Sequence, residues 1–205
     1  LADSTVNGLK ATIKGLLDHY GELGDVRVQI VTFSDSASAR ATWMTLADAK
    51  TFVDKLTANG GTNYDAALAS AQTGFNASGK LAGAVNVSYF FSDGEPTKGR
   101  EVDTGSDKAK WETFLKANDI DSYAMGINGA NSSNLKYLEP IAYNGASETE
   151  RPAVILTSNT AVKTYLDNSV VTVEHGSISG LAGADGLKAR SEEHTSELQS
   201  LRHIS

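Results

Sequence analysis

Apolar residues recur at spacings of three and four in residues 6–20, which predicts an amphipathic helix. Its apolar face consists of Val6, Leu9, Ile13, Leu16, Leu17 and Tyr20. Residues 26–33 (VRVQIVTF) are rich in β-branched apolar residues, which is typical of a strand covered on both faces. The same pattern predicts strands at residues 37–44, 85–91, 119–127 and 153–157, and helices at residues 46–56, 64–75, 107–117, 132–141 and 161–167.

Strands that alternate with helices predict an α/β fold with a doubly wound, mainly parallel sheet and helices on both faces. The pattern changes after Asn168, where residues 169–180 (SVVTVEHGSISG) predict a strand and a turn that leave the domain. We therefore expect one domain over residues 1–168. Residues 169–189 are then a linker or the start of a β-rich repeat.

Both ends of the chain are unusual. The chain opens with Leu1 in place of Met, and we expect further residues upstream. Residues 190–200 (RSEEHTSELQS) resemble one reading frame of a common sequencing adaptor, with a natural polar helix or an expression scar as the alternative. We expect residues 190–205 to be an artefactual tail that packs against nothing in the domain.

Composition excludes several classes of function. The 205 residues carry 18 Lys and Arg against 25 Asp and Glu, a net charge of −7, which argues against binding nucleic acid or anionic membranes. No apolar run reaches the ~18 residues of a membrane-spanning helix, so we expect no membrane insertion. The sequence contains no cysteine, which excludes disulfides, zinc–thiolate sites and thiol nucleophiles within it.

Two predicted loops carry candidate chemistry. In open parallel sheets, ligands bind beyond the carboxyl ends of the strands. There, Thr62 in GGTNYDAAL precedes a helix, and Asp93 in FFSDGEP directly follows a buried strand. A hydroxyl and a carboxylate that converge can offer oxygen ligands to a hard divalent cation. The alternatives are a helix N-cap for Thr62 and a simple turn for Asp93.

The motifs VQIVTFSDSA, GGTNYDAAL and YFFSDGEPT, in this order and spacing, resemble the von Willebrand factor type A domain. The resemblance covers the first helix to about Asn168. It implies a type A, Rossmann-like fold with a metal-ion-dependent adhesion site built from three loops. Thr62 and Asp93 match the second and third loops. The first loop, Asp-x-Ser-x-Ser after the first central strand, is absent, so the resemblance implies a partial site that holds Mg²⁺ or Ca²⁺ weakly.

The resemblance also implies a function in binding. A cation held by few carboxylates keeps net positive charge and can accept a carboxylate from a protein or glycan ligand. Two nearby acids, Asp65 and Glu95, are candidates for supporting the metal ligands or contacting that partner. Their alternatives are a favourable charge at a helix N-terminus for Asp65 and a solvated loop position for Glu95.

The sequences of these motifs most resemble those of type A domains from bacterial repeats-in-toxin surface adhesins. The sequence GLAGADG at residues 180–186 resembles the turn that opens the β-sandwich repeats of those adhesins. This implies a secreted, cell-surface location. Two other functions stay open: an intracellular type A domain that partners an ATP-driven chelatase or remodelling machine, and a Mg²⁺-dependent phosphoryl-transfer enzyme on a similar sheet.

Motifs of common enzymes are absent from the sequence, which has no G-x-x-x-x-G-K-[ST], no G-x-G-x-x-G after a strand and no G-x-S-x-G elbow. We therefore expect no enzymatic activity.

A missing central strand has a structural consequence. In the family, the first strand lies between the strands predicted at residues 26–33 and 85–91. We therefore expect these two strands either to leave a gap or to pair directly with each other. We also expect Thr62 and Asp93 to face each other at the carboxyl edge of the sheet.

Overall fold

The computed structural model describes residues 3–102 and 105–175. The elements of the amino-terminal half are α1 (Asp3–Leu23), β1 (Val31–Phe33), β2 (Ala37–Ala39), α2 (Leu46–Asp54), α3 (Tyr64–Phe75) and β3 (Asn86–Ser92). Those that follow are α4 (Ser106–Ala117), β4 (Ile120–Ile127), η1 (Ser132–Asn134), α5 (Leu135–Leu138), η2 (Glu139–Ile141), β5 (Tyr143–Asn144), β6 (Thr149–Glu150), β7 (Val154–Leu156) and α6 (Asn159–His175). The predicted α/β fold class is confirmed.

The main sheet is centred on β4. β3 pairs with β4 in parallel from Asn86 opposite Ile120 to Ser92 opposite Gly126, and β7 pairs in parallel with the other edge of β4. β5 joins that same edge antiparallel, and β6 pairs with β5. Every residue of β4 is buried, as expected for a strand covered on both faces.

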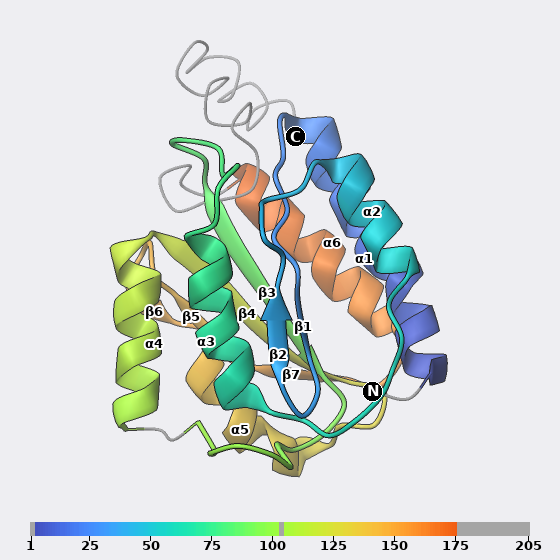
Figure 1. The fold of residues 1–205 in the computed structure, drawn as a ribbon, viewed down its shortest axis with the longest axis vertical. Helices are drawn as coiled ribbons and strands as arrows, with labels where there is room; N and C mark the ends of the chain where they lie inside the picture. Colours follow the sequence, from blue (N-terminus) through green and yellow to red (C-terminus); the bar gives the residue numbers. More distant parts are fainter. Residues whose placement is uncertain (1–2, 103–104, 176–205) are drawn as a thin grey trace.

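Helices cover both faces of this sheet (Figure 1). On one face, apolar residues of α1 and α6 pack against Val87, Tyr89 and Phe91 of β3 and against alternate residues of β4. On the other face, α3, α4 and α5 pack around Phe90. The side chains of β3 alternate between the two faces, because the period of a strand is two. No helix in the described ranges is long and apolar enough to cross a bilayer.

Residues 26–33 do not join the main sheet. β1 pairs with β2 in a separate two-stranded antiparallel sheet, and Val28 exchanges both backbone hydrogen bonds with Met44. In the described part of the chain, no backbone hydrogen bond links residues 26–33 to β3. Of the two outcomes expected from the sequence, the structure shows the gap.

The strand predicted from residue 169 is wrong as far as residue 175, because α6 continues to His175. Ser169 and Val170 are buried, and the Ser169 hydroxyl lies 2.8 Å from the Tyr89 hydroxyl. Tertiary packing therefore overrides the β-propensity of this valine-rich segment. The remaining residues of the predicted linker, and the predicted tail at residues 190–205, lie outside the described residues.

Candidate metal-binding edge

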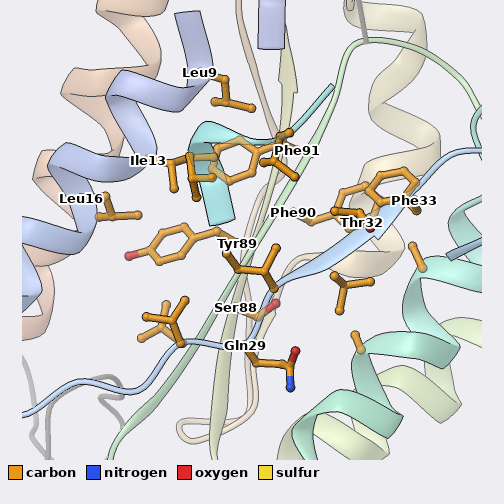
Figure 2. Close-up of a pocket in the computed structure, with 18 of the residues that line it drawn as sticks. Leu9, Ile13, Leu16, Gln29, Thr32, Phe33, Ser88, Tyr89, Phe90 and Phe91 are labelled. Atoms are coloured by element: carbon orange, nitrogen blue, oxygen red, sulfur yellow. The ribbon is translucent and has the colours of Figure 1, made fainter. Parts of the chain in front are cut away.

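A cavity of about 400 Å³ lies between residues 26–33 and β3, and we call it the central cavity. Residues of α1 line one of its sides and residues of α3 line the other (Figure 2). Gly61, Thr62, Ser92 and Asp93 also line it. The two residues singled out from the sequence, Thr62 and Asp93, therefore come from separate loops and lie on the wall of the same cavity.

The Thr62 loop is held by backbone contacts to two other loops. The Gly61 N–H donates to the Asp35 carboxylate at 2.8 Å, and the Thr62 N–H donates to the Thr97 hydroxyl at 3.0 Å. The Thr62 carbonyl accepts hydrogen bonds from the N–H groups of Thr97 and Lys98 at 2.8 and 3.1 Å. Hydrogen bonds at both the N–H and the carbonyl of Thr62 fix its backbone, and so the position of its side chain at the cavity wall.

Asn63, and not Thr62, caps helix α3. The Asn63 side-chain oxygen accepts a hydrogen bond from the Ala66 N–H at 2.9 Å, and its side-chain nitrogen donates to the Asp35 carbonyl at 3.0 Å. The capping alternative for Thr62 is therefore wrong, and another residue satisfies this end of the helix.

Tyr64, which is fully buried, holds the Asp93 loop in place. The Tyr64 hydroxyl donates to the Gly94 carbonyl at 2.7 Å, and the buried Ser92 hydroxyl donates to the same carbonyl at 3.1 Å. Burial raises the pKa of Tyr64 to about 12, the hydrogen bond to Ser92 opposes this, and the charge of Asp93 adds to it. The phenol therefore stays protonated and keeps donating at neutral pH.

The structure does not bring Asp65 and Glu95 to the central cavity. Asp65 lies 3.7 Å from an Arg100 nitrogen, and Glu95 accepts a hydrogen bond from the Tyr137 hydroxyl at 3.4 Å. Neither acid lines the cavity. These contacts correspond to ordinary surface positions.

The residues at this edge fit part of the ligand shell of a hard cation. A threonine hydroxyl and an aspartate carboxylate are oxygen donors of the type that Mg²⁺ and Ca²⁺ take, but these ions require six or more oxygens. Within residues 3–102 and 105–175, no group of three or more His, Asp or Glu side chains could hold a metal ion. Water or a further donor has to complete the shell.

Sequence reasoning missed the two residues that position these loops, Asp35 and Tyr64. Asp35 lies in the turn between β1 and β2, and its carboxylate also accepts the hydrogen bond from the Gly61 N–H in the Thr62 loop. Both contacts join residues that are far apart in the chain, so no local pattern reveals them.

Comparison with known proteins supports the fold. The family model of the von Willebrand factor type A domain matches residues 2–168. A search of curated proteins finds no match.

Several solved structures share the fold. Proximal thread matrix protein 1 from the mussel byssus, in a structure with a zinc-occupied MIDAS motif, has a TM-score of 0.59 at 18% identity over 80% of this chain and 39% of that chain. A von Willebrand factor type A protein from Catenulispora acidiphila has a TM-score of 0.58 at 18% identity over 82% of this chain and 38% of that chain. The pilus adhesin SpaC from Lactobacillus rhamnosus GG has a TM-score of 0.61 at 14% identity over 82% of this chain and 28% of that chain.

This chain therefore spans less than half the length of each of these three proteins. At such low identities, these similarities establish the fold and nothing finer. The family model, which matches most of the sequence, establishes the family. The chain belongs to the von Willebrand factor type A domain family.

Proposed function

We propose that this type A domain binds a partner through a divalent cation held at Thr62 and Asp93, without catalysing a reaction. The observation that carries the proposal is that Thr62 and Asp93 both line the wall of one cavity. They come from different loops, each fixed by hydrogen bonds from a third segment or a buried tyrosine. Because Asn63 caps α3, the Thr62 hydroxyl is not needed for that role.

The donor chemistry favours a hard cation, Mg²⁺ or Ca²⁺. Such an ion, when bound, supplies a positive charge that attracts an acidic group, since the threonine hydroxyl is neutral and only Asp93 offsets the charge. The partner in this proposal is a protein or glycan that offers a carboxylate. The zinc-occupied MIDAS motif of the mussel protein, which shares the fold, supports a divalent cation as the bound species.

The biological setting in this proposal is a secreted adhesin on a bacterial cell surface, of the repeats-in-toxin type. The sequences of the three motifs and the sequence GLAGADG at residues 180–186, which resemble those of such adhesins, support this setting. A shared fold with the pilus adhesin SpaC is in keeping with it.

Calorimetric titration with Mg²⁺ and with Ca²⁺ tests the proposal. We expect weak binding, with a Kd on the order of 10⁻³ M, because one carboxylate and one hydroxyl leave most of the shell to water. Asp93→Ala and Thr62→Val, which removes the hydroxyl with little change of shape, should each abolish the binding heat. Glu95→Gln is the matched control, since Glu95 lies in the same loop as Asp93 but does not line the cavity, and it should bind as the parent does. Equal binding by the parent and Asp93→Ala would place the site elsewhere.

A further inference from the structure

Four Asn-Gly dipeptides occur in the sequence, at residues 7–8, 59–60, 128–129 and 144–145. Asparagine is one of the thermolabile residues of proteins. It loses ammonia when the next backbone nitrogen attacks its side-chain amide carbon, and a following glycine favours this attack because it has no Cβ to block the approach. The attack needs a backbone N–H without a hydrogen-bond partner and an asparagine side chain that is free to turn toward it.

Two of the four dipeptides are held by the helix or the loop in which they lie. Gly8 lies inside α1, where each N–H is bonded to the carbonyl four residues earlier. The Gly129 N–H donates to the Ile127 carbonyl, and the Asn128 side-chain nitrogen donates to the Asn159 side-chain oxygen at 3.0 Å. In both dipeptides the attacking nitrogen is therefore already engaged.

The dipeptide at residues 144–145 is held at both of its reacting groups. The Gly145 N–H donates to the Ile120 carbonyl at 2.8 Å. The Asn144 side-chain oxygen accepts hydrogen bonds from the N–H groups of Ala146 and Ser147 at 3.1 and 3.0 Å. Attack here has to break these hydrogen bonds first.

Asn59 and Gly60 make no contacts of this kind. Both residues are exposed, and within the described part of the chain neither the Asn59 side chain nor the Gly60 N–H has a hydrogen-bond partner. Gly60 has a φ of +74°, a conformation that glycine adopts without strain. This dipeptide therefore meets both conditions for attack.

Gly60 also lies beside the carboxylate that holds the Thr62 loop. A Cβ placed on Gly60 would be 3.6 Å from the Asp35 carboxyl carbon. Asp35 accepts the hydrogen bond from the N–H of Gly61, which is the next residue along the chain. A change of the main chain between residues 59 and 60 therefore acts directly on this hydrogen bond.

We propose that Asn59 is the site of spontaneous deamidation in this chain, and that its isoaspartyl product releases the Thr62 loop from Asp35. The Gly60 nitrogen bonds to the Asn59 side-chain carbon, and ammonia leaves with the proton of that nitrogen. Water then opens the cyclic succinimide at one of its two carbonyl carbons. One opening gives aspartate, and the other gives isoaspartate, in which the main chain runs through the former side-chain carbon. This inference does not depend on the metal site.

The products change the loop in two ways. Both carry a new negative charge, which appears close to the Asp35 carboxylate and is repelled by it. Isoaspartate also adds a methylene group to the main chain, which moves the Gly61 N–H relative to its acceptor. A hydrogen bond weakens steeply when its distance and angle are disturbed, so we expect the isoaspartyl chain to lose this bond.

Incubation at mildly alkaline pH, followed by peptide mapping with mass spectrometry, tests the site. In the folded chain, Asn59 should react at least tenfold faster than Asn7, Asn128 and Asn144. In urea, all four should react at rates within threefold of each other, because a glycine follows each of them. Equal rates in the folded chain overturn the proposal. A preference for Asn59 that persists in urea contradicts the protection of the other three by the fold.

Asn59→Gln is the matched control variant. Its side chain has one more methylene and would have to close a larger ring, which forms far more slowly. The variant keeps the amide and the exposed position, so total deamidation of the folded chain should fall at least fivefold. Deamidation at the parent's total rate would place the reaction at another residue.

Hydrogen exchange at named amides tests the release of the loop. The isoaspartyl chain, separated by chromatography, should exchange the Gly61 N–H at least tenfold faster than the parent does. The Val28 N–H, which donates to Met44, is the internal control and should not change. Equal exchange at Gly61 in the two chains contradicts the release, as does an increase of the same factor at both amides, which would indicate general destabilisation.

Discussion

Single side chains that are far from each other in the sequence set the geometry of the candidate site. Asp35 holds the Thr62 loop through the Gly61 N–H, and Tyr64 holds the Asp93 loop through the Gly94 carbonyl. Tyr64 also contacts Phe33 and Phe90 edge-on, with ring centroids 6.2 and 4.9 Å apart. One buried tyrosine therefore links the hydrophobic core on the α3 face to the loop that carries the proposed metal ligand.

The buried tyrosines make stability sensitive to alkaline pH. Burial raises the pKa of both Tyr64 and Tyr89 to about 12, from an ordinary value of 10.0. Because their pKa is raised in the folded state, the two protonated phenols contribute fully to stability below pH 10. This contribution is lost as the pH rises through 12. We expect the free energy of unfolding to fall by about 2–3 kcal/mol for each of the two residues over this interval. Urea unfolding at a series of pH values measures this fall.

Tyr64→Phe separates the two roles of this residue. The variant loses the hydrogen bond to Gly94 and should be less stable by about 1 kcal/mol at pH 7, because the partly buried Gly94 carbonyl loses one of its two donors. It also lacks the ionisable group, so its unfolding free energy should fall less between pH 10 and 12 than that of the parent. An equal fall in both proteins would show that Tyr64 does not contribute to the alkaline loss.

The candidate metal-binding edge is built from loops that lie in close contact. Two glycines in the loops that carry Thr62 and Asp93 differ in what surrounds them. A Cβ placed on Gly61 would lie 2.6 Å from the Asp35 carboxylate and 2.9 Å from the Thr97 hydroxyl, whereas a Cβ placed on Gly94 would meet nothing within 4 Å. A side chain at residue 61 would therefore require neighbouring side chains such as Asp35 and Thr97 to shift, whereas the loop that carries Asp93 has room at residue 94.

Gly61→Ala should displace the Thr62 loop, while Gly94→Ala should be tolerated. We expect the first variant to weaken Mg²⁺ binding at least fivefold, because either the loop or the Asp35 carboxylate that holds it has to shift to relieve the contact. The second variant adds the same methyl group next to Asp93 and should bind as the parent does. Calorimetric titration of both variants measures the difference. Loss of binding in Gly94→Ala alone would contradict this account of the two loops.

Elements with a strong periodic pattern were predictable, and elements that depend on distant contacts were not. Helices α1 and α3 and strands β3 and β4 all lie within a few residues of their predicted ranges. The β5–β6 hairpin escaped prediction because its strands have only two residues each, too few for a recognisable alternation.

The carboxyl-terminal part of α6 was predicted wrongly for a different reason: its local pattern was clear but indicated a strand. Its valine-rich sequence has the local composition of a strand, but burial of Ser169 and Val170 against the α1 face stabilises a helix. At the candidate site, Thr62 and Asp93 can be selected from the sequence because each lies within a recognisable motif, and their role as metal ligands stays a prediction. The support from Asp35 and Tyr64 was not, because it depends on how separate loops meet.

The whole molecule consists of two sheets that no backbone hydrogen bond connects within the described residues. Side chains join them, as in the stacked pair Phe33 and Phe90 with ring centroids 5.1 Å apart. A two-stranded sheet is marginal by itself, whereas β4 has paired strands on both edges and helices on both faces. The boundary between the two sheets is the central cavity, so it is also the weakest boundary of the fold.

Hydrogen exchange should therefore divide the molecule along this boundary. The two-stranded sheet has three residue pairs, and its β1 residues are only partly buried, so its amides can open locally without unfolding β4. We expect amides of β1 and β2 to exchange at least a hundredfold faster than those of Tyr123 and Ala124, and at rates that change little with low concentrations of denaturant. The β4 amides should instead follow global unfolding, and their rates should rise steeply with denaturant. A common rate and a common denaturant dependence for both groups would mean that side-chain packing alone couples the two sheets into one cooperative unit.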